Sequence, residues 1–304
     1  RRAIAALLVS MVGAMVAPAM TPDEQMSLAD GLYTRAMYDM AVREYLVLLE
    51  KAPDHPAAAS AYFCIADSYR AMSNRVAALR YFAETEKRFP GSLFCYRAAV
   101  KRAELLDEEQ KTGEAIALLR EVVAAKPPAE LTAAALYKLG GLLVKTGQPD
   151  EARTVYGRLV AEFSATPFHP YAALTLAGLH ATAPGGAARA IELFQVAAAA
   201  RGVPRINAEA WFQLGDYYYR EKQYPKSAEA FGKLSSLFPD DQRTSEARLP
   251  WAWSLLYAGM AADALKHADA VLALPVTAGN PVLQEEWLYL TANCQRQIID
   301  HVGA

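Results

Sequence analysis

The sequence predicts an all-α fold: a solenoid of about seven helix–turn–helix repeats, each about 37 residues long, followed by part of an eighth. Three observations predict it. Alanine dominates and β-branched residues are sparse, which favours helix. Stretches with apolar residues at i, i+3, i+4 and i+7 recur in pairs, as in amphipathic helices. No linker divides the 304 residues, although a chain of this length usually forms more than one domain.

The first nineteen residues differ from the rest. Two arginines precede an uncharged apolar run, and Ala17-Pro18-Ala19 follows it. This order is typical of a secretory signal peptide, so we expect residues 1–19 to be removed on export to the periplasm or cell envelope of a bacterium. A retained signal anchor is the alternative, but the run is short for a bilayer and rich in Ala and Gly.

Export would place the three cysteines in an oxidising compartment. Cys64, Cys95 and Cys294 have neither paired spacing nor metal-ligand spacing. Small buried hydrophobes are the better interpretation, and a disulfide between Cys64 and Cys95 on neighbouring units stays open.

One period holds over residues 22–271. A small residue recurs every 37 or 38 positions: Ala41, Ala78, Ala115, Ala152, Ala190, Ser227 and Ala264. Four positions later stand Tyr45, Phe82, Leu119, Tyr156, Phe194, Phe231 and Ala268. Twelve positions before the first series stand Ala29, Ala66, Ala103, Gly140, Gly178, Gly215 and Ala252. Small residues let two helices cross closely, and we expect the aromatic series to fill the space toward the next unit.

The stretch 211–239 carries the pattern most clearly. Its match to the tetratricopeptide repeat signature consists of Trp211, Leu214, Gly215, Tyr218, Tyr224, Ser227, Phe231 and Pro239, with Ser227 where alanine is usual. The resemblance covers roughly residues 22–271 and implies a right-handed α-solenoid. The longer period resembles exported bacterial members of the family, such as the outer-membrane assembly lipoprotein and the Tol–Pal coordinator. The first of these is lipidated, and this chain lacks a suitably placed Cys.

The C-terminal region predicts one more first helix over residues 281–301. Ala292 falls at the phase of Ala252, so the chain should stop inside an eighth unit without a polar capping helix. We therefore expect the solenoid, residues 22–304, to be truncated at its C-terminal end.

No motif predicts catalysis. The five histidines lie on different units, without the spacing of a metal site. GxSxG, HExxH and phosphate-binding glycine loops do not occur. The acidic stretch from Glu104 to Glu109 fits a solvated helix face better than an acid–base pair. We expect no enzyme activity, no metal and no cofactor, and a net charge of −2 predicts no nucleic-acid partner.

The resemblance implies that the first helix of each unit lines a concave groove. The candidate partner-binding residues at groove positions are Asp67, Phe63, Arg70, Tyr137, Phe212, Asp216, Tyr219, Trp253 and Tyr257. Acidic N-terminal units and aromatic C-terminal units suit an extended peptide with basic residues. For Phe63 and Tyr137, packing against the next repeat explains the aromatic ring equally well, whereas Tyr219, Trp253 and Tyr257 favour binding.

Three functions fit these features. The favoured one is a non-catalytic protein–protein interaction scaffold of the bacterial cell envelope. The alternatives are the repeat arm of a larger exported enzyme or receptor, whose working domain lies beyond residue 304, and an outer-membrane protein assembly factor. Fold analogy alone does not decide among them.

Overall fold

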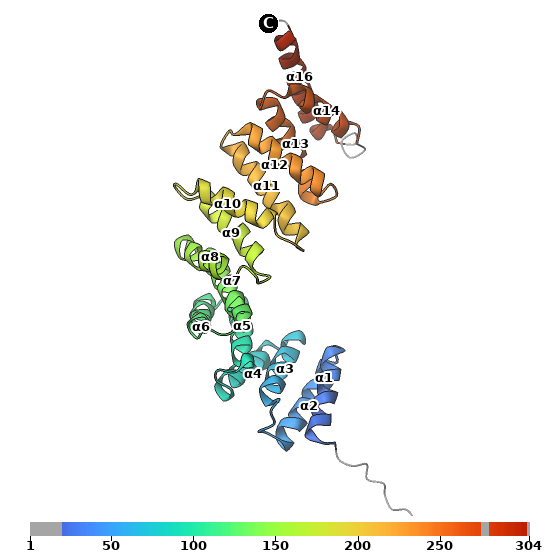
Figure 1. Ribbon diagram of the computed structural model, residues 1–304. Helices are drawn as coiled ribbons and strands as arrows, with labels where there is room; N and C mark the ends of the chain where they lie inside the picture. Colours follow the sequence, from blue (N-terminus) through green and yellow to red (C-terminus); the bar gives the residue numbers. More distant parts are fainter. Residues whose placement is uncertain (1–19, 275–279, 303–304) are drawn as a thin grey trace, which may run out of the picture. The chain divides into compact units, whose positions relative to one another are not determined.

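The computed structural model describes residues 20–274 and 280–302 (Figure 1). Every regular element in these ranges is a helix, so the predicted all-α fold is confirmed. The expected signal peptide, residues 1–19, lies outside the described residues. Among the helices that the structure describes, none combines the length and apolar character that a membrane span needs.

The helices form two compact units, divided at Leu131. The first contains α1 (Pro22–Thr34), α2 (Tyr38–Lys51), α3 (Ala58–Ala71), α4 (Arg75–Arg88), α5 (Leu93–Glu108) and α6 (Thr112–Ala124). Each helix packs against the next, and the first helix of a pair also contacts the first helix of the following pair. This is the pairwise packing that the repeat period predicts.

The second unit begins at Thr132, within α7 (Ala129–Lys145). It continues with α8 (Pro149–Glu162), α9 (His169–Ala181), α10 (Ala187–Ala198), α11 (Pro204–Arg220), α12 (Tyr224–Leu237), α13 (Gln242–Tyr257), α14 (Ala261–Leu272) and α16 (Pro281–Val302). The helix predicted over 281–301 is thus confirmed as α16, whose Trp287, Leu290 and Cys294 pack with α13 and α14.

A recurrent turn joins the two helices of each pair. A residue with positive φ stands in every such turn: Ala36, Ser73, Gln110, Gly147, Gly185, Lys222 and Gly259. In six of these turns the following N–H donates to the carbonyl five residues back, as from Lys111 to Leu106 at 2.8 Å. This is the Schellman motif, which satisfies the last carbonyls of the first helix and reverses the chain. The turn after α9 lacks that bond among those described.

The two small-residue series lie where the paired helices cross. Ala41, Ala78 and Ser227 are fully buried, as are their equivalents in the other units. Phe231 of the aromatic series shares a core cluster with Ala247 and Trp251 of the next unit, as expected, but Tyr156 and Phe231 also pack within their own units. Their rings lie against Gly140 and Gly215 of their own unit's first helix, where an added Cβ would come within 2.6 Å of the ring carbons. At these two positions a Cβ would clash with the ring, which accounts for the glycine there.

The cysteines are all free thiols. Cys64 and Cys294 are buried, and Cys95 is half-buried. No Cys64–Cys95 disulfide is present, and the two buried thiols serve as small core side chains.

Candidate functional site

In the first unit, the candidate carboxylate of Asp67 is already engaged. It accepts a hydrogen bond from the Tyr33 hydroxyl of the preceding repeat at 2.6 Å and another from Arg70 Nε at 2.8 Å. Its side chain is only 15% exposed. Burial, and then the bond to Asp67, raise the pKa of Tyr33 well above its usual value, so the phenol stays a donor. Asp67 and Arg70 thus form an internal pair, with little charge left for a basic partner.

Phe63 packs between two repeats of the first unit. Its ring centroid lies 5.8 Å from that of Phe82 in its own repeat and 5.8 Å from that of Phe94 in the next. The Arg97 guanidinium stands 6.0 Å from the ring centre. These contacts account for Phe63 as a packing residue.

Tyr137 and Phe212 of the second unit also make packing contacts. The Tyr137 ring lies 5.7 Å from Phe168 and 6.2 Å from Tyr171, both in the following repeat. Phe212 lies 6.1 Å from Phe231, and the Arg243 guanidinium covers its ring at 5.1 Å. A binding role for these two residues stays a prediction.

The C-terminal candidates form a continuous series of rings, which we call the aromatic row: Tyr219, Tyr224, Tyr257, Trp253 and Tyr289. Successive ring centroids lie 5.7, 4.8, 5.5 and 6.0 Å apart. The row runs across α11, α12, α13 and α16. Tyr257 is 52% exposed and Tyr289 is 64% exposed, so much of the row is open to a partner. The structure therefore brings Tyr219, Trp253 and Tyr257 together.

Sequence reasoning missed two members of the row. Tyr224 is a position of the repeat signature and was not among the groove candidates. Tyr289 lies outside the seven complete repeats, yet it follows Trp253 by 36 residues, close to the period. Extending the groove positions into the last helix could have found it.

A hollow of about 510 Å³ lies at the end of the row, between α13 and α16. Trp253 and Tyr257 line it from α13, and Tyr289, Asn293, Arg296 and Gln297 line it from α16. We call it the aromatic hollow. Arg296 donates to Asn293 Oδ1 at 3.2 Å and has no carboxylate partner among the described residues.

Asp216, the last acidic candidate, is paired with Arg220 at 3.0 Å. Among the residues that the structure describes, Arg296 is therefore the charged side chain in the lining of the aromatic hollow, and it has no carboxylate partner there. The sequence led us to expect acidic side chains in the groove. Two of them, Asp67 and Asp216, are instead paired with arginines on their own helices.

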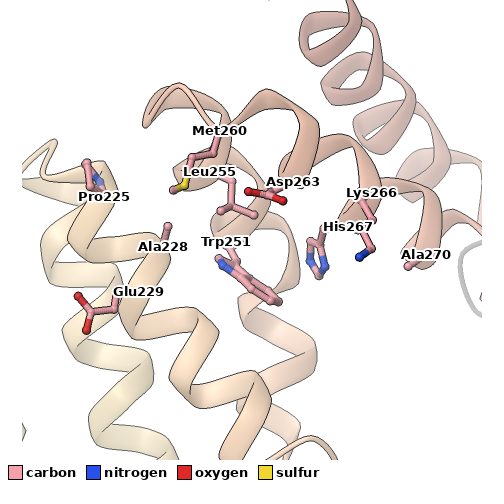
Figure 2. A pocket seen from close by; sticks show the side chains of 10 residues that line it. All are labelled: Pro225, Ala228, Glu229, Trp251, Leu255, Met260, Asp263, Lys266, His267 and Ala270. Atoms are coloured by element: carbon pink, nitrogen blue, oxygen red, sulfur yellow. The ribbon is translucent and has the colours of Figure 1, made fainter. Parts of the chain in front are cut away.

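A second hollow, of about 580 Å³, lies between α12 and α14 with α13 as its floor (Figure 2). We call it the outer hollow. Its apolar wall includes Ala228, Trp251, Leu255, Met260 and Ala270. No sequence motif indicated it, because the second helices of two successive repeats form its sides and the groove positions lie on first helices.

His267 lines the outer hollow beside Trp251, with ring centroids 4.4 Å apart. Its Nε2 donates to the carbonyl of Arg248 at 3.1 Å. Burial lowers the pKa of His267, so the ring is neutral at pH 7. Within the described residues, no group of three His, Cys, Asp or Glu side chains gathers as a metal site.

Comparison with known families gives three matches, each to a tetratricopeptide repeat. They cover residues 65–130, 106–177 and 208–241. No curated protein matches the chain at a significant level.

Solved structures share the fold. PilF of Pseudomonas aeruginosa is 16% identical with a TM-score of 0.51, over 74% of this chain and 95% of that one. A tetratricopeptide repeat protein of Parabacteroides merdae is 13% identical with a TM-score of 0.51, over 89% and 98%. PilW, described as a widely conserved type IV pilus biogenesis factor, is 18% identical with a TM-score of 0.52, over 75% and 99%. At these identities the likeness concerns the fold alone.

Proposed function

This chain contains tetratricopeptide repeats, and we propose that it is a non-catalytic protein–protein interaction scaffold that binds an extended partner segment along the aromatic row. Stacked helix pairs present extended surfaces for such binding. The observation that carries the proposal is the unbroken series of rings from Tyr219 to Tyr289, which ends at the aromatic hollow.

The rings are placed to bury a partner's side chains. Trp253 and Tyr257 are stacked at 25° and present flat apolar faces, while the tyrosine hydroxyls keep a polar edge. Tyr and Trp lose little conformational entropy on binding and dominate many interface hot spots. A hollow of about 510 Å³ accommodates one or two large side chains.

The charges favour an acidic partner. Arg296 is the cation beside the aromatic hollow without a carboxylate partner among the described residues, and the groove candidate Asp216 is paired with Arg220. An aromatic or aliphatic residue next to Asp or Glu would place its side chain in the hollow and its carboxylate on Arg296. The partner expected from the sequence was basic, and the ion pairs of Asp67 and Asp216 weaken that expectation.

We place this scaffold in the bacterial cell envelope. The support is the order of residues in the segment 1–19, which has the plan of a signal peptide. N-terminal sequencing of the protein recovered from a bacterial envelope fraction tests it, because export with cleavage should leave an N-terminus close to Met20. Retention of Arg1 would contradict cleavage.

The binding proposal is tested by crosslinking and affinity purification from the native envelope. A variant with Tyr219, Trp253 and Tyr257 changed to Ala should lose a partner that the wild type recovers. Leu237→Ala is the control, because Leu237 is 59% exposed and ends α12, about 20 Å along the helix from Tyr224. An unchanged partner set in the triple variant would move the site off the aromatic row.

A further inference from the structure

We propose that the outer hollow is a second binding site, which takes a large apolar side chain flanked by a basic residue from a protein partner. It differs from the aromatic row in place and in charge preference. The inference does not rest on the proposed function of the row, because none of the row's residues lines the outer hollow.

The shape of the outer hollow fits an inserted side chain. Figure 2 shows α12 on one side and α14 on the other, with Leu255 and the indole of Trp251 between them. At about 580 Å³ the hollow has room for a Phe, Leu or Trp side chain, and its wall is mainly apolar. A groove between two neighbouring helices is a recurrent receptor for the apolar residues of a partner segment.

Asp263 gives the site its charge preference. In Figure 2 its carboxylate extends from α14 across the mouth, above Leu255 and Trp251. Among the described residues it has no ion pair and no hydrogen bond to its side chain. Glu229, which lines the hollow from α12, is paired with Lys233 at 2.9 Å. The carboxylate at the mouth is thus free to meet a cation on a partner.

Lys266 is the one cation in the described lining. Figure 2 shows its side chain on the Ala270 side of the hollow, away from the Asp263 carboxylate. A basic group of a partner can therefore approach Asp263 without facing Lys266 directly. Asp263 and Lys266 also orient a bound partner segment, since its cation should lie near Asp263 and away from Lys266.

The geometry of α13 keeps the two sites apart. Trp251 and Leu255, one turn apart, face the outer hollow, while Trp253 and Tyr257 belong to the aromatic row. Two residues of separation turn the helix by about 200°, so the sites lie on opposite sides of α13. One scaffold could then hold two partners at once, an acidic one on the row and a basic one in the outer hollow.

Selection of short random peptides displayed on phage, against the whole protein, tests this second site. We expect enriched sequences in which Phe, Leu or Trp adjoins Lys or Arg. Ala270→Trp should weaken the enriched peptide about tenfold or more, because the new ring occupies the hollow. Ala262→Trp is the matched control, since both alanines are exposed on α14 and only Ala270 lines the hollow.

The charge is tested separately. Asp263→Asn should weaken the same peptide, and Asp269→Asn, an exposed change on α14 outside the lining, should not. Because Asp263 also lies in the first turn of α14, the melting temperature of each variant is measured beside its affinity. The triple change of Tyr219, Trp253 and Tyr257 should leave this peptide bound, which separates a failure here from a failure of the row. Enrichment of acidic peptides, absence of enrichment, or equal affinity for Ala270→Trp would overturn the proposal.

Discussion

The ring of Phe231 lies so close to Gly215 that a Cβ added to this glycine would come within 2.6 Å of the ring carbons. We predict that Gly215→Ala destabilises the protein by about 1–3 kcal/mol, because the fully buried ring has no room to withdraw. The measurement is the urea midpoint of the wild type and the variant.

Gly178 offers a matched control at the same position of another repeat. An added Cβ there has no atom within 4 Å, and the residue lies inside α9. Gly178→Ala should therefore stabilise by about 0.5–1 kcal/mol through helix propensity. If both substitutions changed the stability in the same direction, the close approach of Phe231 to Gly215 would not explain the glycine at that position.

The turns within the helix pairs give a second prediction. Gln110 adopts φ of 64° in its turn, whereas Gly147 serves at the equivalent place with φ of 71°. Gln110→Gly should stabilise the protein by up to about 1 kcal/mol, because glycine adopts this conformation without steric cost. Gly147→Ala should destabilise by a similar amount. Thermal unfolding of the two variants measures both, and a loss of stability in Gln110→Gly would show that chain entropy outweighs turn strain.

The period alone predicted the helix pairs, the buried small residues and α16, because each depends on local spacing. It failed where the spacing changes. Ala292 was expected at a small-residue crossing, yet it is exposed, and Cys294 is buried with Trp287 and Leu290 instead. The connection from α14 to α16 is longer than the one from α12 to α13, so the phase shifts.

Side-chain partners set a second limit on prediction from the sequence. Tyr219, Trp253 and Tyr257, which the sequence singled out as groove residues, lie in one series of rings that Tyr224 joins. Their role in binding stays a prediction. The pairing of Asp67 with Tyr33 and Arg70 could not be inferred, since it depends on rotamers across two repeats. The outer hollow was missed as well, because its volume depends on how the side chains of three helices pack, and the repeat period does not predict that packing.

Burial of His267 predicts a loss of stability in mild acid. Burial lowers the pKa of His267 in the folded protein, so the unfolded chain binds the proton more readily. The stability due to the neutral ring is complete above about pH 6.5 and falls as the pH drops below that value. The slope due to this residue is at most about 1.4 kcal/mol per pH unit.

His267→Gln separates this term from others, because burial also lowers the pKa of His169 and His180. The melting temperature should fall less between pH 7.5 and pH 5.5 in the variant than in the wild type. An equal fall in melting temperature in the two proteins would show that the pKa of His267 is not lowered by folding.

Arg296 should decide which peptides the aromatic hollow prefers. Among the described residues it has no carboxylate partner, and it lies beside Trp253, Tyr257 and Tyr289. We predict that a fluorescent peptide with Trp next to Glu binds the wild type more tightly than the same peptide with Lys in place of Glu. One exposed ion pair contributes up to about 1 kcal/mol, so the expected preference is about threefold to fivefold.

Arg296→Glu should reverse this order, since the new carboxylate repels the acidic peptide and attracts the basic one. Arg220→Glu serves as a control on another helix, because Arg220 is paired with Asp216 and does not line the hollow. Raising the salt concentration should reduce the preference in the wild type, as screening weakens exposed pairs. A preference that survives both Arg296→Glu and high salt would show that the rings, and not this cation, select the partner.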